Sequence, residues 1–171
     1  MTKETVSPFQ DWVQTESWRR FRTVGLTGLK GSSKAYLLSV WREKGKGPLL
    51  IVVSSLQQAD ALVEDLLFFM QAGESTICLF PPWETLPYDE IPPHPEIIRE
   101  RVKCLHSVMS GEDIIVVSPI QALMQKVLAP MDLKESMLSL EVGEETSREG
   151  LVRFLQENGY ASARVVEARR L

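Results

Sequence analysis

Short apolar runs recur along the first 120 residues, and they constrain the fold more than any other feature. The run at 49–53 (LLIVV) is apolar throughout, which is typical of a strand covered on both faces of a sheet. Three further strand candidates are shorter or more mixed in composition: 23–27 (TVGLT), 76–80 (TICLF) and 113–117 (DIIVV).

Amphipathic stretches with the helical period separate these runs. Ser54-Ser55 can cap the second of them, in which the apolar positions from Ala59 to Met70 share one face. This helix follows the Ser54-Ser55 cap and includes Met70, and further helices are predicted at about 34–43 and 96–109, and from Pro119 onward. Strands alternating with helices of this length imply right-handed βαβ units. We therefore predict an α/β fold, with a parallel sheet that carries helices on both faces.

The pattern changes after Ala129-Pro130. Three elements are predicted in the remaining chain: an alternating strand at 137–142 (MLSLEV), a helix from Thr146 or Ser147 to Asn158 that Gly159 ends, and a strand at 160–167. This indicates one domain over 1–132, followed over 133–171 by the β-α-β beginning of a small α+β second domain. We expect that second domain to be truncated, since about forty residues are few for an independent core.

Composition argues against several classes of function. The net charge of −4 and the pI of about 5.3 speak against a strongly basic nucleic-acid surface. Cys78 and Cys104 lie far apart in apolar or helical stretches, so we expect reduced, buried thiols and no zinc site. The apolar runs are too short to span a bilayer, and the N-terminus has no signal peptide. We expect a soluble, cytoplasmic protein.

Residues 28–35 (GLKGSSKA) stand between the first strand candidate and the first helix, where a P-loop would lie. Gly28 and Lys34 match the pattern G-x-x-x-x-G-K-[ST], whereas Ser33 replaces the second glycine and Ala35 replaces the hydroxyl that would ligate Mg²⁺. The candidate cofactor-binding residues are Gly28, Gly31, Ser32, Ser33, Lys34 and Ala35.

Three interpretations of this turn remain open: a plain glycine turn, a vestigial nucleotide site, and an active site. We favour the vestigial site, because no later strand candidate ends in a metal-binding acid and Asp89-Glu90 falls in a proline-rich loop. We therefore predict no catalytic residues, no metal ligands and no bound cofactor for this chain.

Other residues have a functional and a structural interpretation. Trp83, Tyr88 and His94 of the proline-rich stretch 81–95 could stack on bases, although we favour aromatics that hold the loop on the core. We expect a solvated helix face from Arg99, Arg101 and Lys103 with the interleaved Glu96 and Glu100, and phosphate contacts are the alternative. We expect a helix docked on the domain from Phe9, Trp12 and Trp18, and a helix that contacts another part of a longer protein is the alternative. We expect a solvated acidic surface from Glu141, Glu144, Glu145 and Glu149, and a surface that faces a partner is the alternative.

Several stretches, taken in order, resemble the N-terminal, UvrB-like region of the bacterial transcription-repair coupling factors (Mfd). They are GLKGSSKAYLL, LLIVVSSLQQADALVEDLLFF, PPWETLPYD and IIRERVKCLHSVMSGEDIIVVSPIQALMQKV. The most specific signals are W-E-T-L-P-Y-D (Trp83 to Asp89) and I-x-x-R (Ile98 to Arg101), and the resemblance runs from about Val24 to Glu167.

The resemblance implies a RecA-like domain with a degenerate P-loop, similar to the first domain of the excision-repair helicase UvrB. It also implies UvrA as a partner, bound through a completed second domain, and contacts with other domains of a full-length protein. ATP and Mg²⁺ would belong to a downstream motor, as would the contacts with RNA polymerase and DNA. No membrane is implied.

Two departures from the related proteins bear on DNA handling and on UvrA binding. The chain passes from Asp89 to Ile97 through too few residues for the DNA-handling hairpin of UvrB. The family's G-E-[FY]-x-x-R-G-type segment and the arginines that contact UvrA would lie beyond Leu171. We therefore expect UvrA binding by this chain to be weak or absent.

The sequence thus favours a scaffold that recruits partners in transcription-coupled nucleotide excision repair. We expect no ATP hydrolysis by this chain, whereas the full-length family protein is an ATP-dependent DNA translocase. The alternative is an active nucleotide-dependent helicase-type domain with a variant P-loop, and a third interpretation is a plain DNA-binding module.

Overall fold

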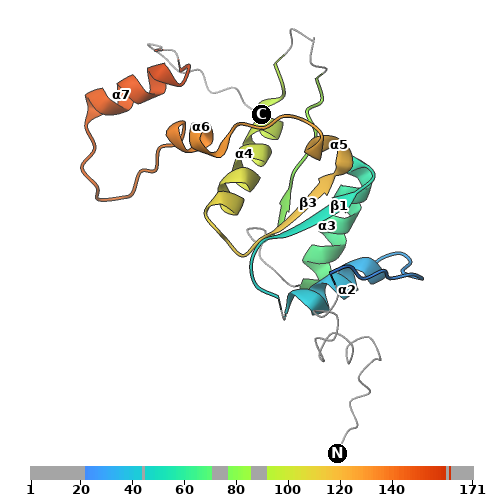
Figure 1. The fold of residues 1–171 in the computed structure, drawn as a ribbon. Coiled ribbons are helices and arrows are strands. Elements are labelled where there is room, and N and C mark those ends of the chain that lie inside the picture. Colours follow the sequence, from blue (N-terminus) through green and yellow to red (C-terminus); the bar gives the residue numbers. More distant parts are fainter. Residues whose placement is uncertain (1–21, 44, 71–76, 86–91, 161, 163–171) are drawn as a thin grey trace, which may run out of the picture. The chain divides into compact units, whose positions relative to one another are not determined.

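The computed structural model describes residues 22–43, 45–70, 77–85, 92–160 and 162 (Figure 1). The chain divides into two units, 1–126 and 127–171, and each is described by itself. The division into domains after residue 132 stays a prediction.

Three parallel strands form the centre of the first unit. They are β1 (Leu49–Val53), β2 (Ile77–Leu79) and β3 (Ile115–Pro119), and they lie in the order β1-β3-β2. Leu49 and Ile77 are both register partners of Ile115, so β3 is the central strand. Parallel neighbours need crossover connections, and helices supply them here. The predicted α/β class with a parallel sheet is confirmed.

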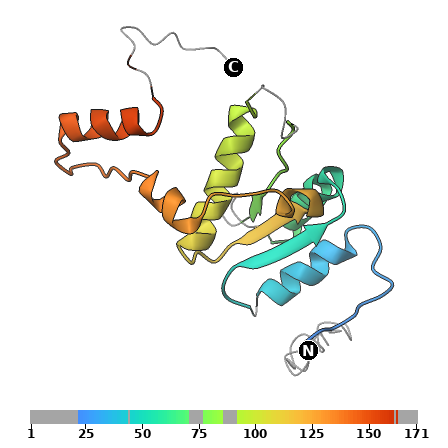
Figure 2. The ribbon, with the colours of Figure 1, turned by 45° about the horizontal axis from the view of Figure 1, so that its top comes forward.

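Helices cover both faces of this sheet, as predicted (Figure 2). On one face lie α2 (Ser33–Arg42) and α3 (Leu56–Met70), and on the other lie α4 (Pro95–Met109) and α5 (Ile120–Leu123). Because successive side chains of a strand point to opposite faces, β3 contributes Val117 to one core and Val116 to the other. The two cores consist of Ala35, Ala59, Leu66, Ile77, Ile115 and Val117, and of Cys78, Phe80, Cys104, Ile114, Val116 and Ala122.

β1 is covered less completely than its apolar sequence predicts. Leu50 and Val52 are 53% and 49% exposed, whereas Leu49, Ile51 and Val53 pack against the core on the α3 side. On the opposite face α4 packs against β2, at the other edge of the sheet. The expectation of a strand buried on both faces is therefore wrong for β1, whereas β3 is buried along its whole length.

The first strand candidate, 23–27, does not form a strand. No described residue pairs with this segment, and Val24 and Leu26 are 42% and 46% exposed. A strand needs a hydrogen-bonded neighbour, which a short apolar run does not specify. The turn at 28–35 therefore does not follow a strand of the sheet.

Two further boundaries differ from the prediction. β3 begins two residues later than expected and continues through Pro119, whose extended backbone then caps α5. The helix predicted from Pro119 is therefore only four residues long.

The predicted capping residues are largely correct. Ser55 Oγ accepts a hydrogen bond from the Gln58 N–H (3.3 Å), and Ser147 Oγ accepts one from the Gly150 N–H (3.2 Å) at the start of α7 (Arg148–Glu157). Gly159, with φ of +86°, lies just after α7 in the left-handed conformation that glycine adopts readily.

The second unit contains α6 (Pro130–Glu135) and α7. The predicted strand at 137–142 does not form, and its apolar residues Leu138, Leu140 and Val142 are exposed. No described strand pairs with it. Most of the last predicted strand, 160–167, lies outside the described residues, as do Phe9, Trp12 and Trp18. None of the helices in the described ranges is both long and apolar enough to cross a membrane.

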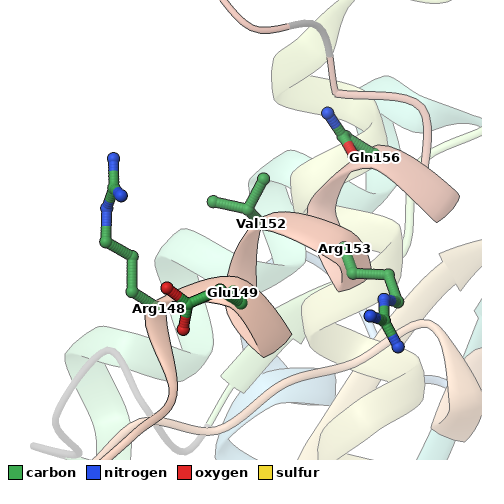
Figure 3. Close-up of a pocket in the computed structure, with 5 residues that line it drawn as sticks. All are labelled: Arg148, Glu149, Val152, Arg153 and Gln156. Atoms are coloured by element: carbon green, nitrogen blue, oxygen red, sulfur yellow. The ribbon is translucent and has the colours of Figure 1, made fainter.

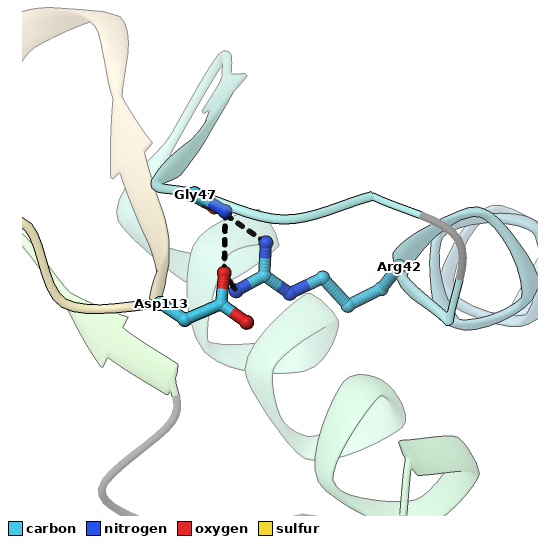
Figure 4. A network of polar contacts seen from close by, with 3 residues as sticks. All are labelled: Arg42, Gly47 and Asp113. Carbon is cyan, nitrogen blue, oxygen red and sulfur yellow. Dashed lines mark hydrogen bonds and ion pairs between the residues drawn. The ribbon is translucent and has the colours of Figure 1, made fainter.

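A polar clamp fastens the connection between α2 and β1 to the start of β3 (Figure 4). Arg42 Nη1 donates to the Gly47 carbonyl (2.5 Å), and the Gly47 N–H donates to Asp113 Oδ1 (2.6 Å). Arg42 Nη2 lies 2.6 Å from the same carboxylate oxygen as an ion pair, although without hydrogen-bond alignment. The Arg42 side chain is 8% exposed, so Asp113 supplies the counter-charge of a buried cation.

Replacing Asp113 with alanine should lower the free energy of unfolding by about 1–2 kcal/mol, because the Gly47 N–H and the Arg42 guanidinium lose their shared acceptor. Urea denaturation measures this loss. Glu112→Ala is the matched control, since Glu112 is exposed and adjacent, and should change stability by at most about 0.5 kcal/mol. Equal effects of the two substitutions would show that the clamp contributes nothing.

Candidate functional site

The P-loop-shaped turn keeps the backbone bends of a glycine-rich loop. Gly28 and Gly31 have φ of +82° and +51°, in the left-handed region where a side chain is strained. The Lys30 carbonyl accepts the Ser33 N–H (3.2 Å) and the Ser33 hydroxyl (2.6 Å). The residue that replaces the second glycine therefore uses its side chain to close the turn internally.

A carboxylate from α3 lies at this turn. The Ser32 hydroxyl donates to Asp65 Oδ1 at 3.0 Å. The negative charge of Asp65 would repel a phosphate placed near Ser32, and it occupies a hydroxyl that the phosphate could otherwise use. Sequence analysis missed Asp65, because an acid within an amphipathic helix carries no signal that it reaches a turn 33 residues away.

The last two positions of the P-loop pattern have opposite environments. Lys34 is exposed, so its ammonium group is accessible to solvent. Ala35 is 0% exposed and belongs to the core beside Ala59 and Leu66. The position where a P-loop carries its metal-ligating hydroxyl is therefore packed into the interior between α2 and α3.

The carboxyl ends of the described strands supply no acid to this turn. β1 is followed by Ser54 and Ser55, and β3 ends at Ser118-Pro119. The buried Ser118 hydroxyl is within hydrogen-bonding distance of the Phe80 carbonyl (3.1 Å) and of the Pro119 carbonyl (3.2 Å). Within the described ranges, no cluster of three or more His, Cys, Asp or Glu side chains could hold a metal ion.

A second polar centre lies where the proline-rich stretch leaves β2. The Arg101 guanidinium packs against two aromatic rings, with its Cζ 4.2 Å from the centroid of the Phe80 ring and 4.2 Å from a ring centroid of Trp83. Arg101 Nη1 donates to the Pro81 carbonyl at 2.6 Å. The backbone N–H of Trp83 donates to Gln125 Oε1 at 2.7 Å. Trp83 thus holds the start of the loop on the core, which agrees with the interpretation favoured for it.

The prediction of a solvated basic face on α4 is wrong for one of its three residues. Arg101 is 1% exposed, and its Nε and Nη2 atoms have no hydrogen-bond partner. Burial lowers the pKa of this guanidinium from its usual value. Arg99 and Lys103 are exposed as expected, and Arg99 pairs with Glu96 one turn away.

Of the other residues noted in the proline-rich stretch, the structure describes His94 but not Tyr88. His94 caps α4, since its Nδ1 accepts the Glu96 N–H at 3.3 Å. Tyr88 lies outside the described residues, as do Asp89 and Glu90. Among the described aromatics of this stretch, Trp83 packs against Arg101 and is partly buried.

One cavity of about 330 Å³ lies in the second unit, along α7 (Figure 3). Its described lining comes entirely from this helix, from Arg148, Glu149, Val152, Arg153 and Gln156. Figure 3 shows Arg148 and Arg153 extending away from each other, so they do not converge on one ligand. The predicted acidic residues Glu141, Glu144, Glu145 and Glu149 are all exposed.

Known proteins with similar sequences share one description, transcription-repair-coupling factor. The protein from Myxococcus xanthus is 31% identical over 166 residues, which cover 94% of this chain and 14% of the relative. The protein from Escherichia coli (strain K12) is 29% identical over 132 residues, or 77% of this chain and 11% of the relative. The protein from Bacillus subtilis (strain 168) is 26% identical over 144 residues, or 84% of this chain and 12% of the relative.

The chain thus spans only 11–14% of the length of these three relatives. No protein-family model matches it.

Proposed function

Because this chain belongs to the family of transcription-repair coupling factors, we propose that it acts as the UvrB-like scaffold module of such a factor. In this role it takes part in transcription-coupled nucleotide excision repair by recruiting partners. It also regulates an ATP-driven DNA translocase that lies elsewhere in the full-length protein.

The observation that carries the scaffold role is the state of the turn at 28–35. The Ser33 hydroxyl closes the turn on the Lys30 carbonyl, and the Ser32 hydroxyl is bonded to Asp65. Ala35 is buried in the core. A P-loop requires free backbone and hydroxyl groups for phosphate and metal, so these contacts support a module that neither binds nor hydrolyses ATP.

The fold supports the same role. The parallel sheet with helices on both faces retains the layered architecture of a nucleotide-binding domain, and the Arg101 centre fixes the loop that follows β2. A packed α/β domain of this kind is suited to be a platform on which other domains and proteins assemble.

We propose that the partner is UvrA, and that its contact surface forms only when the second unit is completed by residues beyond Leu171. RNA polymerase and DNA are contacted by other domains of the full-length protein. The exposed apolar residues Leu138, Leu140 and Val142 support this, because they form no strand in the chain as it stands. Additional chain could supply the strand that they need as a partner.

A capture experiment with purified UvrA tests the proposal. The 171-residue chain should retain little or no UvrA, whereas a longer chain that completes the second domain should retain it in a stoichiometric complex. Circular dichroism of both chains controls for folding. Equal capture by the two chains would move the contact surface into residues 1–171, and failure of the longer chain would refute UvrA recruitment.

A further inference from the structure

A cavity of about 310 Å³ lies at the β2 edge of the sheet, between α3 and α4. Apolar side chains of α3 and β2 line most of it, and two thiols, Cys78 of β2 and Cys104 of α4, complete its wall together with Glu100 and Lys103. Its volume far exceeds that of a water molecule, so a small polar reagent fits inside. This cavity is separate from the P-loop-shaped turn and from the Arg101 centre.

The two thiols belong to the same buried cluster. Cys78 is 4% exposed and Cys104 is 2% exposed, so both are buried, as the sequence predicts. Cys104 Sγ lies 3.1 Å from the Leu79 carbonyl, to which its S–H donates. The residue next to Cys78 in β2 thereby orients the Cys104 thiol.

The surroundings make the two thiols chemically unequal. The neighbouring Cys104 thiol lowers the pKa of Cys78 to about 7, against the opposing effect of burial, and the Lys103 ammonium lowers it further. The Cys78 thiol, together with burial, raises the pKa of Cys104 above its usual value. Cys78 is therefore the more acidic thiol of the pair.

We propose that Cys78 and Cys104 form a dithiol modification site that small peroxides, entering through the cavity, oxidise to a disulfide between β2 and α4. The support is the shared cavity wall, the common buried cluster of the two thiols, and the Lys103 ammonium in the same cavity lining. Two cysteines that only fill the core would need neither a cavity nor a charged neighbour.

The chemistry uses hydrogen peroxide as the only co-reactant. The Cys78 thiolate attacks one peroxide oxygen and the O–O bond breaks, which gives Cys78 sulfenic acid and a hydroxide ion. The hydroxide takes up the proton that the Cys78 thiol had released to solvent and becomes water. The Cys104 sulfur then attacks the sulfenic sulfur, so that the S–S bond forms and the S–O bond breaks. The Cys104 proton leaves with the hydroxyl group as water. Two thiols lose two electrons, and the peroxide is reduced to two waters.

The test treats the folded 171-residue chain with a small excess of hydrogen peroxide and follows its intact mass. The wild-type chain should lose the mass of two hydrogen atoms, and peptide mapping should find Cys78 joined to Cys104. Cys104→Ser should accumulate a sulfenic acid at Cys78 that dimedone traps, whereas Cys78→Ser should yield no such adduct. Lys103→Gln, at an exposed position, should slow the wild-type reaction several-fold.

Two results would overturn the proposal. One is a wild-type chain that keeps both thiols free while folded and oxidises only in urea. The other is a disulfide that forms at the same rate in Lys103→Gln, together with dimedone labelling of Cys104 in Cys78→Ser. The wild-type mass and peptide map decide the matter even if a serine variant fails to fold.

Discussion

Replacing Arg101 with alanine should lower the free energy of unfolding by about 3 kcal/mol, a loss typical of large-to-small changes in a core. The side chain is 1% exposed and packs against the rings of Phe80 and Trp83, and truncation leaves a cavity beside them. It also removes two cation–π contacts and the hydrogen bond that the Pro81 carbonyl accepts. Urea or thermal denaturation measures the change.

Part of this loss is offset, because the wild-type guanidinium leaves two buried nitrogen atoms without partners. Arg101→Met separates the contributions: it keeps most of the volume, removes the charge and its desolvation cost, and should lose less stability than alanine. Trp83 fluorescence should change in both variants if they release the indole from its stacked position, although the other tryptophans contribute background.

Arg99→Ala is the matched control, since Arg99 is on the same helix, is exposed, and pairs only with Glu96 at the surface. Its substitution should change stability by at most about 0.5 kcal/mol. Equal losses for Arg99→Ala and Arg101→Ala would show that the buried contacts of Arg101 do not contribute to the free energy of unfolding.

The burial of Arg101 was readable from the sequence in part. The buried residues of α4 are Arg101, Cys104 and Ser107, which follow one another at a spacing of three on one face of the helix. The helical period of these positions, taken alone, would have placed Arg101 on the buried face of α4. The alternation with Glu96 and Glu100 nevertheless favoured a solvated face, because an unpaired buried arginine is rare. The two aromatic partners come from elsewhere in the chain, and helical periodicity cannot reveal them.

The helices and the parallel sheet were predictable because their signals are local: periodicity, caps at Ser55 and Ser147, and the stop at Gly159. The absence of strands at 23–27 and 137–142 was not predictable, because a strand also depends on a partner that its own residues do not specify. The same limit applies to the turn at 28–35. Its missing glycine and hydroxyl were visible in the sequence, whereas the approach of Asp65 depends on how α3 packs.

Restoring the P-loop hydroxyl with Ala35→Thr should destabilise the chain by about 1–3 kcal/mol and should not create a nucleotide site. Ala35 is 0% exposed against Ala59 and Leu66, so threonine adds volume to a packed core and buries a hydroxyl group there. Lys34→Ala is the matched control: it is the adjacent, exposed position and should change stability by at most about 0.5 kcal/mol.

Calorimetry with Mg-ATP on the same three chains connects this packing to function. Wild type, Ala35→Thr and Lys34→Ala should all show no binding at millimolar nucleotide, because Asp65 and the closed turn remain in each. Micromolar binding by the wild-type chain that Lys34→Ala weakens would instead establish a working variant P-loop and refute the scaffold role. A stable Ala35→Thr chain that gains Mg-ATP binding would show that Ala35 alone had silenced the site. The measured stability of Ala35→Thr therefore decides whether the loss of the hydroxyl is reversible or is fixed by the core.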